Sequence, residues 1–397
     1  MKTLWFLPIL FCCMAAWSAT DTQAAFPEPD QFPVLRELPD PFLMNSGQRV
    51  STRGEWAQRR AEIVELLLHY EYGHLPPAPN AVTAENEVVR DAFDGKARVH
   101  EFGLRVGDKN GFVIHAGVIV PTKGGPKFPV IVAVDPVFQP QAEAAARQVI
   151  ERGYALAGFM YMELDPKKGD RSVGVFPFYP DCDGGSLALW AWAAMRLADH
   201  LCTRDDIDAS QMTITGHSRC GRAALLAGAL DERFALVAPH ASGAGGAGSF
   251  RIQPAGVETL YSITKPERYA CWFHPRLRGF AGKEYRLPFD QHFLQALVAP
   301  RALLSTVALA DEYSNPLGTQ QTFRAALPVF RFLGAGGKAA MWFREGGHDM
   351  VPEDWTALLD YADIIFKGKP RTNNFNRLPF PDKPKAFSWS GLPTARP

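Results

Sequence analysis

Residues 213–224 read TITGHSRCGRAA, and this stretch decides the fold prediction. The β-branched residues at its start indicate a strand, Gly216 opens a tight turn around Ser218, and the small residues that follow indicate a helix. A strand that runs through such a turn directly into a helix predicts the nucleophile elbow of an α/β-hydrolase. This elbow would expose the Ser218 hydroxyl. It would also leave the next backbone N–H at a helix N-terminus, where it can stabilise an oxyanion.

Apolar runs and helical patterns alternate on both sides of the elbow. Their alternation predicts an α/β fold, with a mostly parallel central sheet covered by helices on both faces in a three-layer αβα sandwich. Upstream of this part, a hairpin turn at residues 108–111 joins two more predicted strands. The predicted strands are residues 98–106, 111–121, 128–134, 154–162, 212–215, 234–237, 302–309 and 339–343. The predicted helices are residues 55–70, 141–152, 186–201, 219–230, 320–332 and 354–366.

The N-terminus has the pattern of an export signal. Lys2 supplies a positive charge, and an apolar run at residues 4–16 follows it, with small residues at a cleavage point near 18–24. The run is too short for a transmembrane helix. We therefore predict a signal peptide at residues 1–24, one catalytic domain at 25–370 and an extended C-terminal tail at 371–397. The mature chain would be periplasmic or secreted.

The composition limits the partners of the chain. Lys and Arg together number 42, as do Asp and Glu, so no net charge would attract nucleic acid or an anionic membrane surface. We find no zinc-ligand spacing and no phosphate-binding loop, and we predict neither a metal nor a cofactor. We expect a monomer that acts on a small-molecule or neutral-polymer substrate. Removal of the signal would leave four cysteines, whose three possible pairings stay open: Cys182, Cys202, Cys220 and Cys271.

A general base for Ser218 is expected late in the chain. His348 lies in the segment FREGGHDM at residues 343–350, between a predicted strand and the final predicted helix. A catalytic histidine on such a late loop completes the order serine, acid, histidine. His240, His274 and His292 are alternatives, but none of them combines the late position with the preceding Gly-Gly pair.

The elbow departs from the usual spacing, because its second glycine lies three residues after Ser218. In this respect it resembles the glucuronoyl esterases (carbohydrate esterase family 15), whose elbow reads G-C-S-R-x-G-K. In this chain His217 replaces the Cys and Arg222 replaces the Lys. The resemblance continues in residues 227–233, 242–246, 290–294, 298–301 and 346–348. It implies a carbohydrate ester as substrate, formed by glucuronic acid or its 4-O-methyl form, as in lignin–xylan cross-links.

The acid of the triad is open between two residues. In fungal glucuronoyl esterases a Glu stands 23 positions after the nucleophile, and the equivalent residue here is Ala241. Some bacterial relatives carry the acid after the next core strand, which here precedes Asp311. A general α/β-hydrolase also places its Asp there, ahead of the histidine. We predict Asp311 as the acid, with Glu312 as the alternative.

The resemblance also implies roles for residues around the pocket. Arg219 would help to stabilise the oxyanion, and Arg222 would meet the uronate ring. Tyr313 stands where relatives carry a Trp that lines the sugar pocket. Glu258 and Glu267 lie in a segment where relatives place a sugar-contacting Glu, and the choice between the two stays open.

Two other functions remain possible at this point. One is a different carbohydrate esterase, such as one that removes acetyl groups from xylan. The other is a non-catalytic carbohydrate-binding relative, which the missing Glu at Ala241 makes conceivable.

Overall fold

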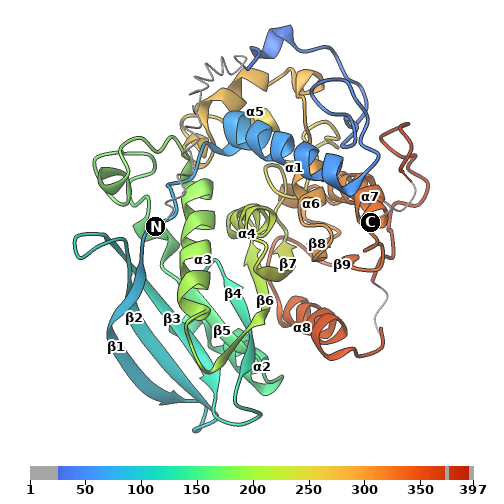
Figure 1. The fold of residues 1–397 in the computed structure, drawn as a ribbon. Helices are drawn as coiled ribbons and strands as arrows, with labels where there is room; N and C mark the ends of the chain where they lie inside the picture. Colours follow the sequence, from blue (N-terminus) through green and yellow to red (C-terminus); the bar gives the residue numbers. More distant parts are fainter. Residues whose placement is uncertain (1–25, 372–374, 393–397) are drawn as a thin grey trace, which may run out of the picture.

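The computed structural model describes residues 26–371 and 375–392, so the predicted signal peptide lies outside the described residues. Strands of the described chain form one sheet of nine, in the order β1-β2-β3-β5-β4-β6-β7-β8-β9 (Figure 1). Pairing is antiparallel from β1 to β5 and parallel from β5 to β9. The strands are β1 (Val82–Ala92), β2 (Ala97–Val106), β3 (Phe112–Pro121), β4 (Phe128–Ala133), β5 (Ala155–Phe159), β6 (Ile207–His217), β7 (Phe234–His240), β8 (Ala302–Ala308) and β9 (Ala339–Arg344).

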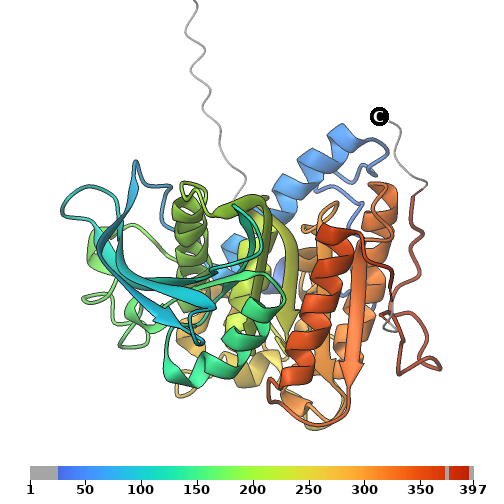
Figure 2. The ribbon, with the colours of Figure 1, turned by 90° about the horizontal axis from the view of Figure 1, so that it is seen from below.

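Helices cover both faces of this sheet, so the predicted three-layer α/β-hydrolase architecture is confirmed (Figures 1 and 2). Helices α2 and α8 pack into one apolar core on one face. A larger core on the other face includes residues of α1, α3, α4, α6 and α7. The helices are α1 (Arg53–Leu67), α2 (Glu143–Glu151), α3 (Ser186–Leu201), α4 (Arg219–Leu230), α5 (Leu260–Ile263), α6 (His292–Ala296), α7 (Pro316–Phe332) and α8 (Pro352–Lys367).

Strand β1 was not predicted, and its exposure explains why. It is the edge strand of the sheet, and none of its residues is buried. Its sequence, VTAENEVVRDA, therefore lacks the alternation of apolar and polar residues that a half-covered strand shows. In contrast, the predicted strands β4 and β5 are continuous apolar runs, because helices cover them on both faces.

Helix α7 begins at Pro316, four residues before the predicted start at Gln320. Asn315 precedes it in the left-handed region (φ 52°), and its side-chain oxygen accepts a hydrogen bond from the Gly318 N–H. Asn is one of the few residues that tolerate this backbone conformation, and Pro suits the first helical position. This local geometry fixes where the loop after β8 ends.

The C-terminal tail has neither helix nor strand over residues 375–392, but its side chains bind it to the domain. Phe375 and Phe387 are buried, and the Trp389 indole N–H donates to the Leu38 carbonyl. The sequence left the disulfide pairing of four cysteines open, and in the structure all four are free thiols: Cys182, Cys202, Cys220 and Cys271. In the described part of the chain, no helix has both the length and the apolar character needed to cross a membrane.

Two glycines allow β6 and α4 to approach closely at the elbow. A Cβ on Gly216 would lie 2.4 Å from the Cys220 carbonyl oxygen, and one on Gly221 would lie 2.7 Å from the His240 carbonyl oxygen. Neither backbone atom can move aside without displacing β7 or the first turn of α4. The late second glycine of the motif is therefore required by contact with β7.

We predict that Gly221→Ala lowers the free energy of unfolding by about 2 kcal/mol or more, because the methyl group would overlap backbone atoms. Urea denaturation measures this. Gly337→Ala is the matched control, since nothing lies within 4 Å of a Cβ at that position. Equal stability of the two variants would contradict the argument.

Candidate active site

Ser218 occupies the turn between β6 and α4 with a strained backbone. Its φ is 57° and its ψ is −124°, which is rare for a residue with a side chain. Its N–H donates to the His240 carbonyl oxygen over 2.9 Å, and this bond ties the turn to β7. The side chain stands immediately before α4, at the positive end of the helix dipole. The predicted elbow is therefore present at the predicted residues.

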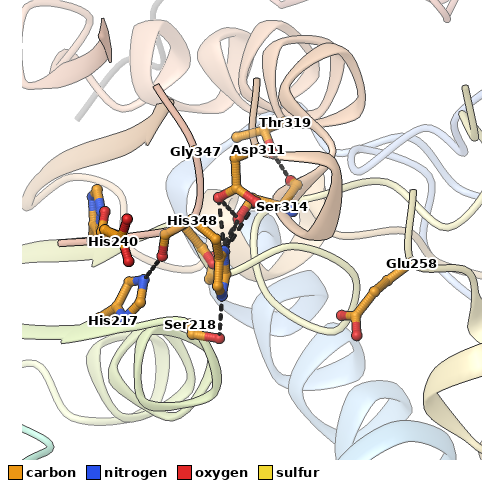
Figure 3. A network of polar contacts seen from close by, with 12 residues as sticks. His217, Ser218, His240, Glu258, Asp311, Ser314, Thr319, Gly347 and His348 are labelled. Carbon is orange, nitrogen blue, oxygen red and sulfur yellow. Dashed lines mark hydrogen bonds and ion pairs between the residues drawn. The ribbon is translucent and has the colours of Figure 1, made fainter. Parts of the chain in front are cut away.

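His348 connects Ser218 to Asp311 (Figure 3). Its Nε2 lies 2.8 Å from Ser218 Oγ, and its Nδ1 lies 2.9 Å from both carboxylate oxygens of Asp311. A carboxylate accepts only, so Nδ1 carries the proton and Nε2 accepts from the serine hydroxyl. This is the arrangement in which a serine, a histidine and an acid work together.

Asp311 is buried and held by Ser314 as well as by His348. The Ser314 N–H donates to Oδ1 over 3.1 Å, and the Ser314 hydroxyl donates to Oδ2. Burial alone would raise the pKa of Asp311, but the hydrogen bonds from His348 and Ser314 outweigh it and hold the pKa below its usual value. The carboxylate therefore stays charged and can stabilise an imidazolium.

The structure does not bring the alternative acid, Glu312, to the histidine. Its side chain is exposed, and its carboxylate lies near Gly256. Ala241, which the resemblance places at the position of the fungal Glu, has its carbonyl oxygen 2.9 Å from the Ser314 hydroxyl oxygen. The carboxylate bonded to His348 thus lies after β8, and the position 23 residues after Ser218, immediately after β7, carries an alanine.

The rival histidines have other partners. His240 is buried, with Nδ1 2.7 Å from the Thr306 hydroxyl. His274 lies near Asp183, and His292 Nε2 lies 2.8 Å from the Pro39 carbonyl oxygen. In the described structure none of these three imidazole rings is hydrogen-bonded to the Ser218 hydroxyl, whose ring partner is His348.

Ser218 opens into a pocket of about 460 Å³. Of the residues predicted to bind substrate, Arg219, Arg222, Glu258 and Tyr313 line it, whereas Glu267 is exposed and does not. The further lining residues are Asp135, Tyr161, His217, Cys220, Arg268, Tyr269, Trp272 and His348.

Arg222 is a buried cation with one free donor. Its Nη2 donates to Glu258 over 2.7 Å and its Nε donates to the Ser242 carbonyl over 2.7 Å. Its Nη1 is buried and has no hydrogen-bond partner among the residues that the structure describes. A buried donor without a partner is costly unless a ligand satisfies it. Together with Glu258, it offers neighbouring donor and acceptor groups to a polar ligand.

The two remaining predicted residues lie close to the nucleophile. The guanidinium of Arg219 is exposed, and its Nη2 donates to the Tyr161 hydroxyl over 2.9 Å. The ring of Tyr313 is also exposed, 5.2 Å from the His348 ring between centroids. Both side chains can reach a ligand above Ser218.

Sequence reasoning missed an aromatic wall of the pocket. Tyr269 and Trp272 stack with their ring centroids 4.1 Å apart, and the Arg222 guanidinium lies 5.4 Å from the Trp272 ring. Both aromatics follow α5, in a segment without regular periodicity. Their only signal was the aromatic composition of that loop. Within the described chain, no group of three His, Cys, Asp or Glu side chains is arranged to hold a metal ion.

An elbow serine on a mostly parallel sheet, joined through a histidine to a buried aspartate, is the arrangement of the serine hydrolases of the α/β-hydrolase fold. A family model described as "Glucuronyl esterase, fungi" matches residues 106–334, which is more than half of the chain. The chain belongs to the glucuronoyl esterase family, carbohydrate esterase family 15, as the resemblance predicted. It is a carboxylic ester hydrolase by this membership.

Individual relatives agree with the family. A 4-O-methyl-glucuronoyl methylesterase from Podospora anserina is 32% identical over 76% of this chain, which spans 62% of that relative's length. A family 15 glucuronoyl esterase from Caldicellulosiruptor kristjansonii has a TM-score of 0.78 at 32% identity, covering 92% of this chain and 99% of the other. A glucuronoyl esterase of Sporotrichum thermophile, solved with methyl 4-O-methyl-β-D-glucopyranuronate, has a TM-score of 0.68 at 26% identity. The match covers 85% of this chain and 90% of the other.

We predict that Asp311→Ala lowers kcat by about 10³-fold or more. The substitution removes the carboxylate that keeps the proton on His348 Nδ1 and stabilises the protonated imidazole. Initial rates on an ester substrate measure this. The neighbouring Glu312→Ala is the matched control and should stay within about twofold of the unmodified chain. A larger loss in Glu312→Ala than in Asp311→Ala would assign the acid to Glu312.

Proposed function

We propose that this chain hydrolyses esters of glucuronic acid or 4-O-methyl-glucuronic acid, as found in lignin–carbohydrate complexes of plant cell walls. The observation that carries the proposal is the hydrogen-bonded line Ser218–His348–Asp311, which opens into a pocket with a buried, partly unpaired Arg222. Relatives named for 4-O-methyl-glucuronoyl ester hydrolysis support the sugar. The geometry alone supports a serine esterase.

The reaction would proceed in two acyl-transfer steps. His348 Nε2 takes the Ser218 proton as Oγ bonds to the ester carbonyl carbon. The tetrahedral intermediate then collapses, its C–O bond to the alcohol breaks, and His348 returns the proton to the departing alkoxide. In the second step His348 deprotonates a water, which attacks the acyl-enzyme. The free uronic acid leaves and Ser218 regains its proton.

Two donors would stabilise the oxyanion of each intermediate. The backbone N–H of Arg219 belongs to the first residue of α4, so the helix dipole adds to its effect. The Arg219 guanidinium lines the same pocket, where its bond to Tyr161 restricts its position. Donors placed in advance at this point contribute more than any other single term in many hydrolases.

Arg222 and Glu258 would bind the sugar. Arg222 Nη1 can donate to a sugar oxygen, and Glu258 can accept from a hydroxyl beside it. Tyr313 and the Tyr269–Trp272 pair offer aromatic faces to the ring. Glu267, predicted as the alternative to Glu258, is exposed outside this pocket and takes no part in the proposal.

We further propose that the chain is exported to the periplasm or secreted, and that it acts as a monomer with one catalytic domain at residues 25–370. A polymer-bound ester is accessible only outside the cell, in agreement with the signal predicted at residues 1–24. Every residue that the proposed mechanism uses belongs to this chain.

The two alternative functions differ from this proposal in testable ways. A xylan acetyl esterase would recognise the alcohol side of the ester, and it would not need a buried cation next to the acyl group. A non-catalytic relative would not need a serine, histidine and aspartate within hydrogen-bond distance of one another. The observed contacts therefore favour a catalyst.

The test is hydrolysis of benzyl glucuronate and of acetylated xylan by the purified chain without residues 1–24, with Ser218→Ala as control. We expect turnover of the glucuronate ester that disappears in Ser218→Ala. Turnover of acetylated xylan alone would support the serine mechanism and reject glucuronate esters as the substrate. Undiminished turnover in Ser218→Ala would reject the mechanism.

A further inference from the structure

In the loop that carries His348, the six consecutive backbone carbonyls from Arg344 to Asp349 all accept hydrogen bonds. Two of them accept from the backbone of the segment after β8: the Leu309 N–H donates to the Arg344 carbonyl over 2.8 Å, and the Ala310 N–H donates to Gly346 over 3.0 Å. The guanidinium of Arg344 donates to Glu345 over 2.8 Å, to Gly347 over 3.3 Å and to Asp349. Most of this loop is exposed, so these bonds restrict a segment that side-chain packing does not.

The remaining carbonyl is that of His348 itself, and its bond partner is His217. His217 Nε2 lies 2.6 Å from the His348 carbonyl oxygen (Figure 3). A carbonyl can only accept, so Nε2 of His217 carries the proton. The two rings lie 4.8 Å apart between centroids, so His217 touches both the backbone and the ring of this residue.

The three side chains that hold this loop are the last residues of three strands. His217 ends β6, His240 ends β7 and Arg344 ends β9. His240 adds a contact of 3.4 Å from Nε2 to the Asp349 carbonyl. Carboxyl ends of parallel strands meet at one edge of a sheet, so the sheet presents all three donors to the loop above it.

A buried carboxylate fixes two of these donors in turn. Asp354, at the start of α8, accepts from Arg344 Nε over 2.9 and 3.0 Å and lies 3.5 Å from His240 Nε2. Among the described contacts His217 makes no hydrogen bond to a carboxylate, and its side chain lines the substrate pocket. Burial lowers the pKa of His217, and repulsion by His348 lowers it further, so the ring stays neutral when His348 takes up a proton.

We propose that His217 is a positioning residue for the base, and that its Nε2–H bond to the His348 carbonyl sets the distance from the imidazole to Ser218. This rests on the proposed role of His348. Asp311 fixes the imidazole from the Nδ1 side, and His217 fixes the backbone of the same residue. Without the second contact, the ring could turn about its bond to Asp311 and move away from Oγ. A misplacement of about 1 Å can cost up to about 100-fold in rate.

His217 stands where the family motif quoted above, G-C-S-R, has a cysteine. A cysteine is a much weaker donor than an imidazole N–H and is shorter. The bond to the His348 carbonyl is therefore a property of this histidine and does not follow from the elbow as such.

The test compares His217→Ala, His217→Gln and His217→Asn on 4-nitrophenyl acetate, which needs the triad but no sugar contact. The amide nitrogen of Gln lies as many bonds from Cα as Nε2 of His does, whereas that of Asn lies one bond nearer. We expect His217→Ala and His217→Asn to lose about tenfold or more in kcat, with KM within about twofold, and His217→Gln to keep at least about half of kcat.

Labelling of Ser218 by a fluorophosphonate should slow in parallel in the Ala and Asn variants, because it reports the reactivity of the nucleophile. A kcat of His217→Ala within about twofold of the unmodified chain would overturn the proposal. If His217→Ala does not fold, the comparison of His217→Gln with His217→Asn tests the proposal. Equal kcat values for these two variants would overturn it as well.

The failure of this proposal can be told apart from the failure of the proposed function. Serine-dependent cleavage of 4-nitrophenyl acetate without cleavage of benzyl glucuronate would reject the sugar and leave His217 testable. Loss of all activity in Ser218→Ala, with unchanged rates in the three His217 variants, would reject the role of His217 alone.

Discussion

The close contact between strand β6 and helix α4 is the constraint on which the rest of the site depends. Because Gly216 and Gly221 have no Cβ, the chain can reverse within a few residues and hold Ser218 at a positive φ. The N–H of Ser218 bonds to β7, so the strain is maintained by the sheet and not by the turn alone. This geometry exposes the hydroxyl and aligns α4 behind it. The proposed oxyanion donor and the proposed nucleophile thus both depend on a single backbone feature.

The parallel half of the sheet brings the other groups to that hydroxyl. Asp311 follows β8 and His348 follows β9, while His217 and His240 end β6 and β7. These residues lie up to 131 positions apart in sequence, yet neighbouring strand ends make them adjacent, as in α/β folds generally. The loops after these strands are short, so the segments that carry the side chains have little conformational freedom. Hydrogen bonds to the carbonyls of the His348 loop restrict that segment further. The pocket wall comes instead from the long segment between β7 and β8, where Glu258, Tyr269 and Trp272 lie.

The elbow, the late histidine and the mostly parallel sheet could be predicted from the sequence, because each of them has a local sequence pattern. Ser218 stands in a strand–turn–helix motif, and His348 follows a strand with a Gly-Gly pair. The acid could be narrowed only to Asp311 or Glu312, because two adjacent carboxylates cannot be separated without knowing which one the loop buries. Strand β1 was missed because an exposed edge strand has no apolar face. Tyr269, Trp272 and the role of His217 required the structure, since they depend on contacts between segments distant in sequence.

The central claim is that Ser218 forms a covalent acyl-enzyme with His348 as its base. Rapid quenching of the chain during turnover of benzyl glucuronate, followed by mass spectrometry of its peptides, tests this most directly. The account predicts a glucuronoyl adduct on the peptide that contains Ser218, and no adduct in His348→Ala. Turnover without any adduct on that peptide, or an adduct at another residue, would contradict it.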